Sequence, residues 1–252
     1  MGRDLRMVRF SEIAPVEAGL EFQRTVAEQV TNQTATPLLV AWRCHPALLV
    51  SSWETRLPEF DKASAALDAA GWPVFVRRSG GAACPVGPGT LQVAMIEPAS
   101  PNATMTAEYA RLAEMIRTTL ACFGVAAQIG CVPAAFCPGR FDVAVEGKKI
   151  AGLSQHWFRN RRGVRCLIVA ASLNLEEPPD LLSRLVNQFY RIAGSPLGCE
   201  ATALTNLILS AGATFGAGQD LAEAVVARFR DAARCDLSFP VKPGKSASPA
   251  QA

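Results

Sequence analysis

Histidine is scarce in this sequence, and its cysteines do not form a metal-binding pattern. The chain has two histidines, His45 and His156, and none of its eight cysteines belongs to a Cys-x-x-Cys pair. Structural zinc sites use four cysteine or histidine ligands at short spacings, and thioredoxin-like sites use Cys-x-x-Cys. We therefore expect neither a metal site nor a dithiol redox centre.

Charge and long apolar runs are also limited. Charged residues make up 19% of the 252 residues and apolar residues 50%, with a net charge of +3. This balance excludes disorder as the main state and gives no reason to expect nucleic acid as a partner. No uninterrupted run reaches the roughly 20 apolar residues of a membrane-spanning helix, and residues 1–6 lack an apolar signal core. We expect a cytoplasmic protein with no membrane partner.

Helices and strands are mixed along the chain without a regular strand–helix–strand repeat, which predicts an α+β fold. Apolar residues at helical spacing predict helices over residues 16–30, 60–70 and 105–123. Three further helices are predicted in the last third, from apolar stripes that begin at Leu182, Leu204 and Leu221. The fold is predicted as one domain over residues 1–240, followed by a disordered tail over 241–252.

Short apolar runs between turn residues predict the strands. They cover residues 36–42, 47–52, 72–77, 90–96, 141–145, 149–152 and 164–170. Turn residues at His45–Pro46 and Glu146–Gly147 predict two hairpins.

Cys137 is a candidate nucleophile. Pro138 directs it away from helical geometry, and Gly139 permits a sharp bend immediately afterwards. A cysteine on such a turn is more exposed than one on a packed stripe, and cations nearby would stabilise its thiolate. The alternative interpretation is a buried and inert thiol.

Lys149 is a second candidate, because a lysine in an otherwise apolar strand is costly to bury unless it has a task. Strict alternation predicts Lys149 and Ala151 on one side of the strand and Lys148 and Ile150 on the other. Lys149 would then lie beside small residues, where a ligand could fit. The alternative is a lysine at a solvent-facing edge.

A glycine pair after a strand is the third candidate, in the segment Arg77–Arg78–Ser79–Gly80–Gly81. Without a Cβ the backbone can approach a ligand closely, and an arginine beside it can hold a carboxylate, phosphate or carbonyl. A purely structural turn is the alternative. Further along, Arg159, Arg161, Arg162 and Arg165 form a basic cluster, which favours an acidic partner unless it is a solvated loop.

Together these segments resemble the superfamily of lipoate–protein ligases, octanoyltransferases and biotinyl ligases. Its motif order is Arg-x-Ser-Gly-Gly and then Gly-x-Lys-Ile-x-Gly-x-x-Gln, which matches Arg77–Gly81 and Gly147–Gln155. The block from Cys137 to Gln155 is the specific part. It is most similar to the branch of octanoyl-[glycine cleavage H protein]:protein N-octanoyltransferases. The resemblance implies a catalytic domain of the biotinyl and lipoyl ligase type, with mixed, largely antiparallel sheets packed with helices.

The resemblance also implies an amidotransferase that works through a cysteine acyl-enzyme, without a cofactor. Cys137 would attack the acyl carbonyl and form a thioester, and a lysine of a lipoyl domain would then take the octanoyl or lipoyl group. Lys149 would polarise that carbonyl. The residues expected to bind substrate are Arg77, Ser79, Gly80, Gly81 and Gly152.

The partners implied by the resemblance are acidic lipoyl-domain proteins. They are the glycine cleavage H protein and the E2 subunits of 2-oxoacid dehydrogenases, with acyl carrier protein as an alternative donor. The arginine cluster after Gln155 fits such partners.

Two other functions remain open at this point. In an ATP-dependent lipoate–protein ligase, which would need ATP and magnesium, Lys149 would grip an acyl-adenylate and Cys137 would be incidental. Val86–Gly87 stands where such ligases carry a His-Asp pair, which favours the transferase. A non-catalytic module could use the same fold to bind an acyl chain or a lipoyl domain. The transferase requires the sulfur of Cys137 and the ammonium of Lys149 to meet at an apolar cavity.

Overall fold

Two sheets organise the fold. The structure is a computed structural model that describes residues 6–32, 38–160, 162–212 and 220–234. Within these residues the larger sheet has seven strands in the order β1-β2-β6-β10-β9-β8-β7, and only the β1–β2 pair is parallel. Its strands are β1 (Arg6–Ala14), β2 (Leu38–Cys44), β6 (Thr90–Pro98), β7 (Ala127–Ile129), β8 (Val143–Val145), β9 (Lys148–Arg159) and β10 (Arg165–Asn174).

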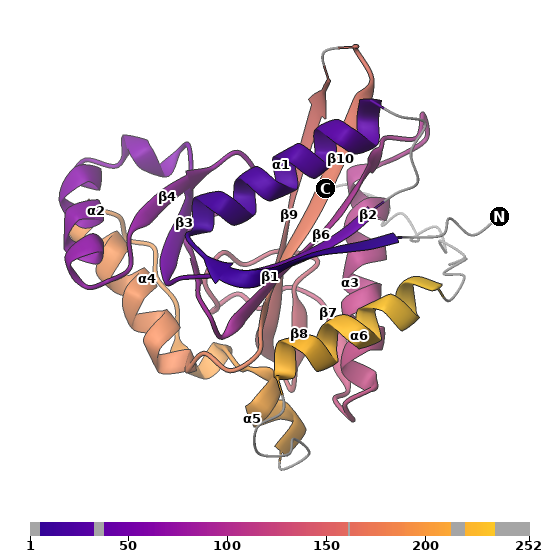
Figure 1. The fold of residues 1–252 in the computed structure, drawn as a ribbon. Coiled ribbons are helices and arrows are strands. Elements are labelled where there is room, and N and C mark those ends of the chain that lie inside the picture. Colours follow the sequence, from indigo (N-terminus) through magenta and orange to yellow (C-terminus); the bar gives the residue numbers. More distant parts are fainter. Residues whose placement is uncertain (1–5, 33–37, 161, 213–219, 235–252) are drawn as a thin grey trace, which may run out of the picture.

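The smaller sheet has its own helical cover. Its order is β4-β3-β5, from β3 (Ala47–Ser51), β4 (Val74–Arg77) and β5 (Cys84–Val86). The helices α2 (Phe60–Ala69) and α4 (Pro179–Ala193) pack beside it, at the left of Figure 1. The amphipathic stripe of α4 buries Leu185, Val186 and Phe189 against Leu48 and Val50 of β3.

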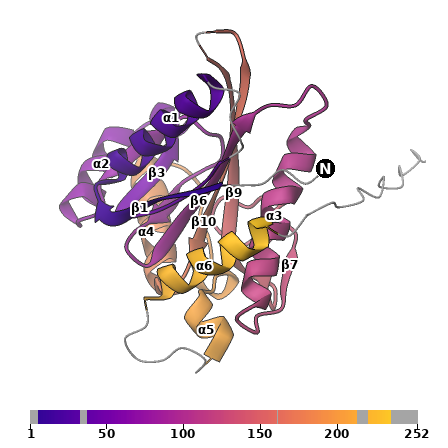
Figure 2. The same cartoon turned by 45° about the vertical axis from the view of Figure 1, so that its right-hand side comes forward.

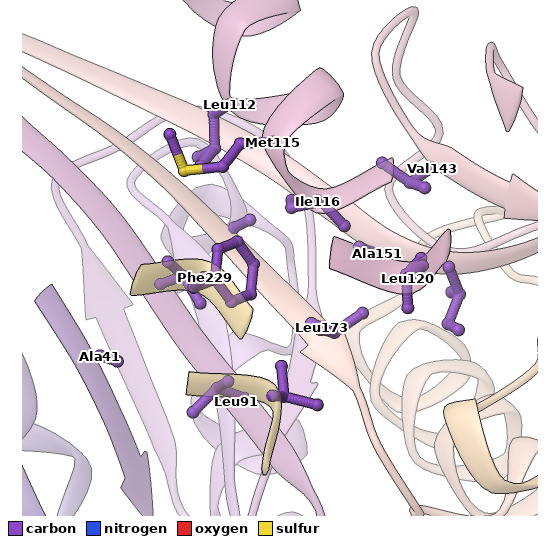
Figure 3. Packing of buried hydrophobic residues seen from close by; sticks show 14 of the residues in the cluster. Ala41, Leu91, Leu112, Met115, Ile116, Leu120, Val143, Ala151, Leu173 and Phe229 are labelled. Atoms are coloured by element: carbon purple, nitrogen blue, oxygen red, sulfur yellow. The ribbon is translucent and has the colours of Figure 1, made fainter. Parts of the chain in front are cut away.

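The large sheet is apolar on both faces, and alternation along β6 shows how the faces divide. Leu91, Val93 and Met95 face the main core, which α3 (Met105–Ala121) and α6 (Leu221–Arg234) complete. Ala94 and Ile96 face the other side, where α1 (Val16–Asn32) packs. The two views show α1 on one side of the sheet and α3 and α6 on the other side (Figures 1 and 2). In Figure 3, Phe229 of α6 lies between the α3 side chains and the strands.

Three short helical segments complete the chain. They are η1 (Glu54–Arg56), η2 (Ala201–Ala203) and α5 (Leu207–Ala211). Among the described residues no helix combines the length and the apolar character needed to cross a membrane.

Most of the predicted architecture is confirmed. The fold is α+β with a largely antiparallel large sheet, and the helices predicted from residues 16, 60 and 105 begin at those positions. The hairpin at Glu146–Gly147 is confirmed, and both residues have the positive φ angles, 50° and 75°, that a tight two-residue turn requires. The predicted tail over 241–252 and Arg161 lie outside the described residues.

The hairpin predicted at His45–Pro46 is wrong. β2 pairs with β1 and β6, and β3 pairs with β4 and β5, so the chain passes from one sheet to the other at this point. Cys44 and Ala47, which flank the turn, are both buried. Each run is apolar on both faces, so each occupies a central position in its own sheet instead of pairing with the other.

The helix predicted from the stripe at Leu204 is also wrong in its extent. Leu204 forms an isolated bridge with Lys149, and α5 begins only at Leu207, after Asn206 caps it by accepting from the Leu209 amide. Ile208, expected on the buried stripe, is 42% exposed. The strands β1, β5 and β7 were not predicted, because β5 and β7 span three residues each and β1 mixes polar with apolar residues.

The packing of α1 on the sheet can be tested at Gly19, where an added Cβ would overlap ring carbons of Trp42. Alanine favours an isolated helix by about 1 kcal/mol over glycine. We nevertheless expect Gly19→Ala to lower the free energy of unfolding by about 1–3 kcal/mol, because the overlap forces α1 or Trp42 to move. Urea unfolding measures this. Gly130→Ala, where a Cβ would meet nothing within 4 Å, is the control and should change little.

Candidate active site

A cavity of about 780 Å³ lies between α1, the small sheet and the face of the large sheet formed by β6, β10 and β9. Small-molecule sites in proteins commonly have such volumes. Cys137, Lys149 and Gly152 line it near the start of β9, and Arg159 and Asn160 line it near the end of that strand. Apolar side chains from α1 and both sheets line the part between: Leu20, Ala27, Leu49, Phe75, Ile168 and Ala170.

Cys137 lies on the turn between β7 and β8 with an unusual backbone. Its φ is 44°, and within the described residues Glu146 is the only other non-glycine residue with a positive φ. This conformation costs a residue with a side chain about 1–3 kcal/mol and persists only where the surroundings enforce it. The thiol is half-buried and lines the cavity. A strained cysteine on a cavity wall is a candidate functional residue.

The ammonium of Lys149 holds this turn. Nζ donates to the carbonyl oxygens of Phe136 at 3.0 Å and Cys137 at 2.7 Å, and it lies 3.0 Å from Oδ1 of Asp142. Three acceptors match the three protons of an ammonium group. Lys149 could therefore donate to an acyl carbonyl, as the family resemblance implies, only by giving up one of these acceptors.

Asp142 balances the charge of Lys149 in the interior. The two side chains are 2% and 3% exposed, respectively. Burial raises the pKa of Asp142, and the nearby charge of Lys149 opposes that rise. Oδ2 of Asp142 accepts from the amide of Gly139 at 2.9 Å. A buried ion pair is stable only when its remaining hydrogen-bonding positions are filled, and here the turn that carries Cys137 fills them.

An irregularity in the β8–β9 pairing decides which way Lys149 points. Val143 pairs with Ala151, but Ala144 pairs with Lys149, so the register shifts between them. The predicted shared side for Lys149 and Ala151 is therefore wrong: Ala151 packs in the main core, and Lys149 lines the cavity with Gly152. A Cβ at Gly152 would lie 2.8 Å from Cε of Lys149, so glycine leaves the room this side chain needs.

The predicted Arg77–Gly81 segment divides into residues that line the cavity and residues that shape the loop. Arg77 and Ser79 line the cavity, whereas Gly80 and Gly81 are not among the described lining residues. The guanidinium of Arg77 donates to the carbonyls of Gly80 at 3.2 Å and Ala82 at 2.7 Å. Gly81 has a φ of 108°, a conformation that favours glycine. Arg77 thus holds the loop in place.

Two cysteines of the cavity have different surroundings. The amide of Ala82 donates to Sγ of Cys137 at 3.0 Å, a contact that favours the thiolate. Cys84 also lines the cavity, but burial raises the pKa of its thiol. Burial, with a smaller contribution from Arg78, lowers the pKa of His156, so this imidazole is neutral near pH 7. Of the two thiols, Cys137 is the better placed nucleophile.

Few groups of the site are suited to a metal or an anionic cofactor. Within the described part of the chain no three histidine, cysteine, aspartate or glutamate side chains gather as a metal site requires. Arg24 lines the cavity but is paired with Glu21 and Glu28. Arg78 and Arg159 are the cavity cations through which an anionic group could be bound.

Asp142 is a site residue that the sequence prediction missed. A signal was present, because a lysine inside an apolar strand needs a compensating charge. The Cys137–Gln155 block holds two acidic residues, Asp142 and Glu146, and Asp142 is the one that pairs with Lys149. Ser51 and Tyr190, which contact the loop at Gly81 and Ala83, carried no such local signal.

Comparison with known proteins identifies the family of the chain. The family model described as the lipoyl protein ligase A/B catalytic domain matches residues 15–195. The chain belongs to this family. The matched region contains the cavity residues from Glu17 to Ser172, including Cys137 and Lys149.

Relatives within the family are transferases by name. An octanoyl-[GcvH]:protein N-octanoyltransferase of Anoxybacillus flavithermus is 30% identical over 167 residues, which is 65% of this chain and 60% of the relative. A lipoyl-[GcvH]:protein N-lipoyltransferase of Listeria monocytogenes is 27% identical over 171 residues, 68% of this chain and 60% of the relative. The chain thus spans about 60% of the length of these curated relatives.

Solved structures share the fold. Lipoate-protein ligase A bound with ATP superposes with a TM-score of 0.68 at 15% identity, over 92% of this chain and 85% of that one. The putative lipoate protein ligase Ta0514 of T. acidophilum with bound lipoic acid gives 0.65 at 14% identity, over 92% and 86%. At such low identities the likeness shows the fold alone.

The Lys149–Asp142 pair gives a prediction with a defined pH dependence. Lys149→Met leaves a buried carboxylate without its cation, and we expect the free energy of unfolding to fall by about 3–5 kcal/mol at about pH 8. Without Lys149 the pKa of Asp142 rises further above its value in the unfolded chain. The folded state then binds the proton more tightly, so acidification to about pH 5 should reduce the deficit.

Denaturant unfolding at the two pH values measures this difference. Lys148→Met, which removes the exposed neighbouring lysine, is the matched control and should change stability little at either pH. A deficit of the same size at both pH values would argue against the pairing described here.

Proposed function

We propose that the protein transfers an octanoyl or lipoyl group, through a thioester on Cys137, to the lysine of a lipoyl domain. One observation carries the proposal. A cysteine in a left-handed conformation and a buried lysine line the same end of a largely apolar cavity. The names of the relatives in the family support this chemistry.

The proposed reaction has two balanced steps. The Cys137 thiolate attacks the acyl carbonyl, a C–S bond forms, and the bond to the donor breaks. If the donor is an acylated lysine, its nitrogen takes up a proton from solvent as the C–N bond breaks and leaves as an amine, whereas a thioester donor leaves as a thiolate. The acceptor amine then attacks the thioester, a C–N bond forms, and the Cys137 thiolate is released while the amine loses a proton. Neither step requires ATP.

Lys149 has a double role in this proposal. It holds the carbonyls of Phe136 and Cys137 and so fixes the turn that presents the sulfur. Its positive charge would also stabilise the negative charge that develops on the acyl carbonyl during attack. Arg77 and Ser79 border the acyl chain along the cavity wall, and Gly152 leaves room for Lys149.

The acyl donor and acceptor are proposed as acidic carrier domains. The glycine cleavage H protein is the first candidate, because the relatives are named for acting on it. E2 lipoyl domains and acyl carrier protein are further candidates. The β9–β10 hairpin carries three exposed arginines, Arg159, Arg162 and Arg165, which would attract such partners. Of these, Arg159 lines the cavity at the end away from Cys137.

The acyl-enzyme can be observed directly. We expect intact-mass analysis to find an octanoyl adduct after incubation with octanoyl-acyl carrier protein, because a thioester donor is not lower in energy than the enzyme thioester. Cys137→Ala should abolish the adduct. Cys131→Ala, which removes an exposed cysteine six residues earlier, should retain it.

Other outcomes identify the alternatives. An adduct that persists in Cys137→Ala would exclude this residue as the nucleophile. Pyrophosphate released from ATP only when lipoate is present would indicate a ligase. No adduct and no pyrophosphate, with tight binding of an acylated carrier, would indicate a binding module.

The arginine surface gives a second prediction of function. The double variant Arg162→Glu and Arg165→Glu should raise KM for an H protein about 10-fold or more at low salt, with kcat little changed, because rim charges govern encounter. Added salt should reduce the difference in KM between the double variant and the wild type. Arg230→Glu on the exposed side of α6, across the sheet from the cavity, is the matched control. An equal effect of the control would count against a docking role.

A further inference from the structure

The peptide between Gly81 and Ala82 directs its N–H at the sulfur of Cys137. The amide nitrogen of Ala82 lies 3.0 Å from Sγ. The approach is close, because a Cβ at Gly81 would come within 2.9 Å of that sulfur. This amide is therefore positioned to stabilise a thiolate through a hydrogen bond.

The carbonyl of the same peptide is held from the opposite side. The oxygen of Gly81 accepts from Nε1 of Trp53 at 2.8 Å, and Oγ of Ser51 lies 2.8 Å from it. In a trans peptide the C=O and N–H point in opposite directions. Donors that fix the oxygen therefore fix the direction of the N–H, and they also polarise the amide so that it donates more strongly.

The next peptide is anchored by a buried carboxylate. The amide of Ala83 donates to Oη of Tyr190 at 3.0 Å, and that hydroxyl donates to Oε1 of Glu54 at 2.5 Å. Glu54 is fully buried, and its Oε2 accepts from the amide of Ser51 at 2.7 Å. The carboxylate thus ties the end of β3 and helix α4 to the loop that faces Cys137.

We propose that Trp53 and Ser51 are positioning residues, which aim the Gly81–Ala82 amide at the sulfur of Cys137 and so raise the reactivity of that thiol. Glu54 and Tyr190 hold the frame on which they act. The inference rests on the proposed role of Cys137 as the nucleophile. It assigns a task to the Ser51–Glu54 segment, which lies outside the Cys137–Gln155 block and contributes no side chain to the cavity wall among the described lining residues.

The test measures thiol reactivity and needs no substrate. Wild type and Trp53→Phe are alkylated with iodoacetamide across a pH series, and modification of each cysteine is followed by peptide mass analysis. Trp53→Phe keeps an aromatic ring but loses the N–H. We expect alkylation of Cys137 to slow by about 2- to 10-fold at neutral pH, the effect of one hydrogen bond. The rate–pH profile should shift to higher pH and reach a similar plateau.

Trp157→Phe is the matched control. It removes an indole N–H that donates at 2.8 Å to Oε1 of Gln155, away from the Gly81–Ala82 peptide. Its Cys137 profile should match the wild type. Ser51→Ala supplies a second positioning variant and should shift the profile in the same direction as Trp53→Phe.

The outcomes separate the two proposals. If wild-type Cys137 reacts no faster than the exposed Cys122 and Cys131, it is no activated nucleophile and the proposed function falls with the inference. If wild-type Cys137 reacts rapidly and both positioning variants keep its profile, only the positioning role is overturned. A shift of equal size in Trp157→Phe would also overturn it.

Discussion

The buried ion pair between Lys149 and Asp142 is the interaction on which the site depends. Two charges in the interior lose hydration that their mutual attraction does not by itself restore. The loss is offset because the remaining donors and acceptors of the pair bind the turn over residues 136–142. The contacts that stabilise the ion pair therefore also fix the conformation of Cys137. Cys137 is stable here in a left-handed conformation that it would not adopt in an isolated turn.

The strand register of the large sheet allows the Lys149–Asp142 pair to form. Lys149 is the second residue of β9, and a regular antiparallel register would place its side chain on the same face as Ala151, within the main core. The shift in register against β8 turns Lys149 toward the cavity while Ala151 stays in the core. Gly152 then leaves the space that the lysine stem occupies. The bulge at the start of β9 and the absence of a Cβ at Gly152 thus allow this strand to direct Lys149 into the candidate site.

These details also explain what the sequence could and could not predict. Long periodic segments, such as the helix beginning at Met105, were predicted because apolar residues recur along them at helical spacing. Cys137 and Lys149 were chosen as candidates because each is unusual in its local sequence. Cys137 precedes a proline, and Lys149 lies in an otherwise apolar strand. The separation of β2 and β3 into different sheets was not predicted, because turn residues at His45–Pro46 are compatible both with a hairpin and with a change of sheet. The orientation of Lys149 relative to Ala151 depends on a bulge, which has no signal in the sequence of a single strand. Ser51, Trp53 and Tyr190 meet Gly81 and Ala83 only through tertiary packing.

The sulfur of Cys137 is consequently defined by two separate parts of the fold. Its backbone is held from the large sheet through Lys149 and Asp142, whereas its amide donor belongs to a loop held from the small sheet. The distance between sulfur and donor therefore depends on how the sheets are packed against each other. That packing is made by the apolar cluster in which Trp42 and Ala94 of the large sheet meet Leu49 and Val86 of the small one under α1. Because this cluster also surrounds part of the cavity, a ligand that fills the cavity contacts the same elements that set the sulfur–amide distance.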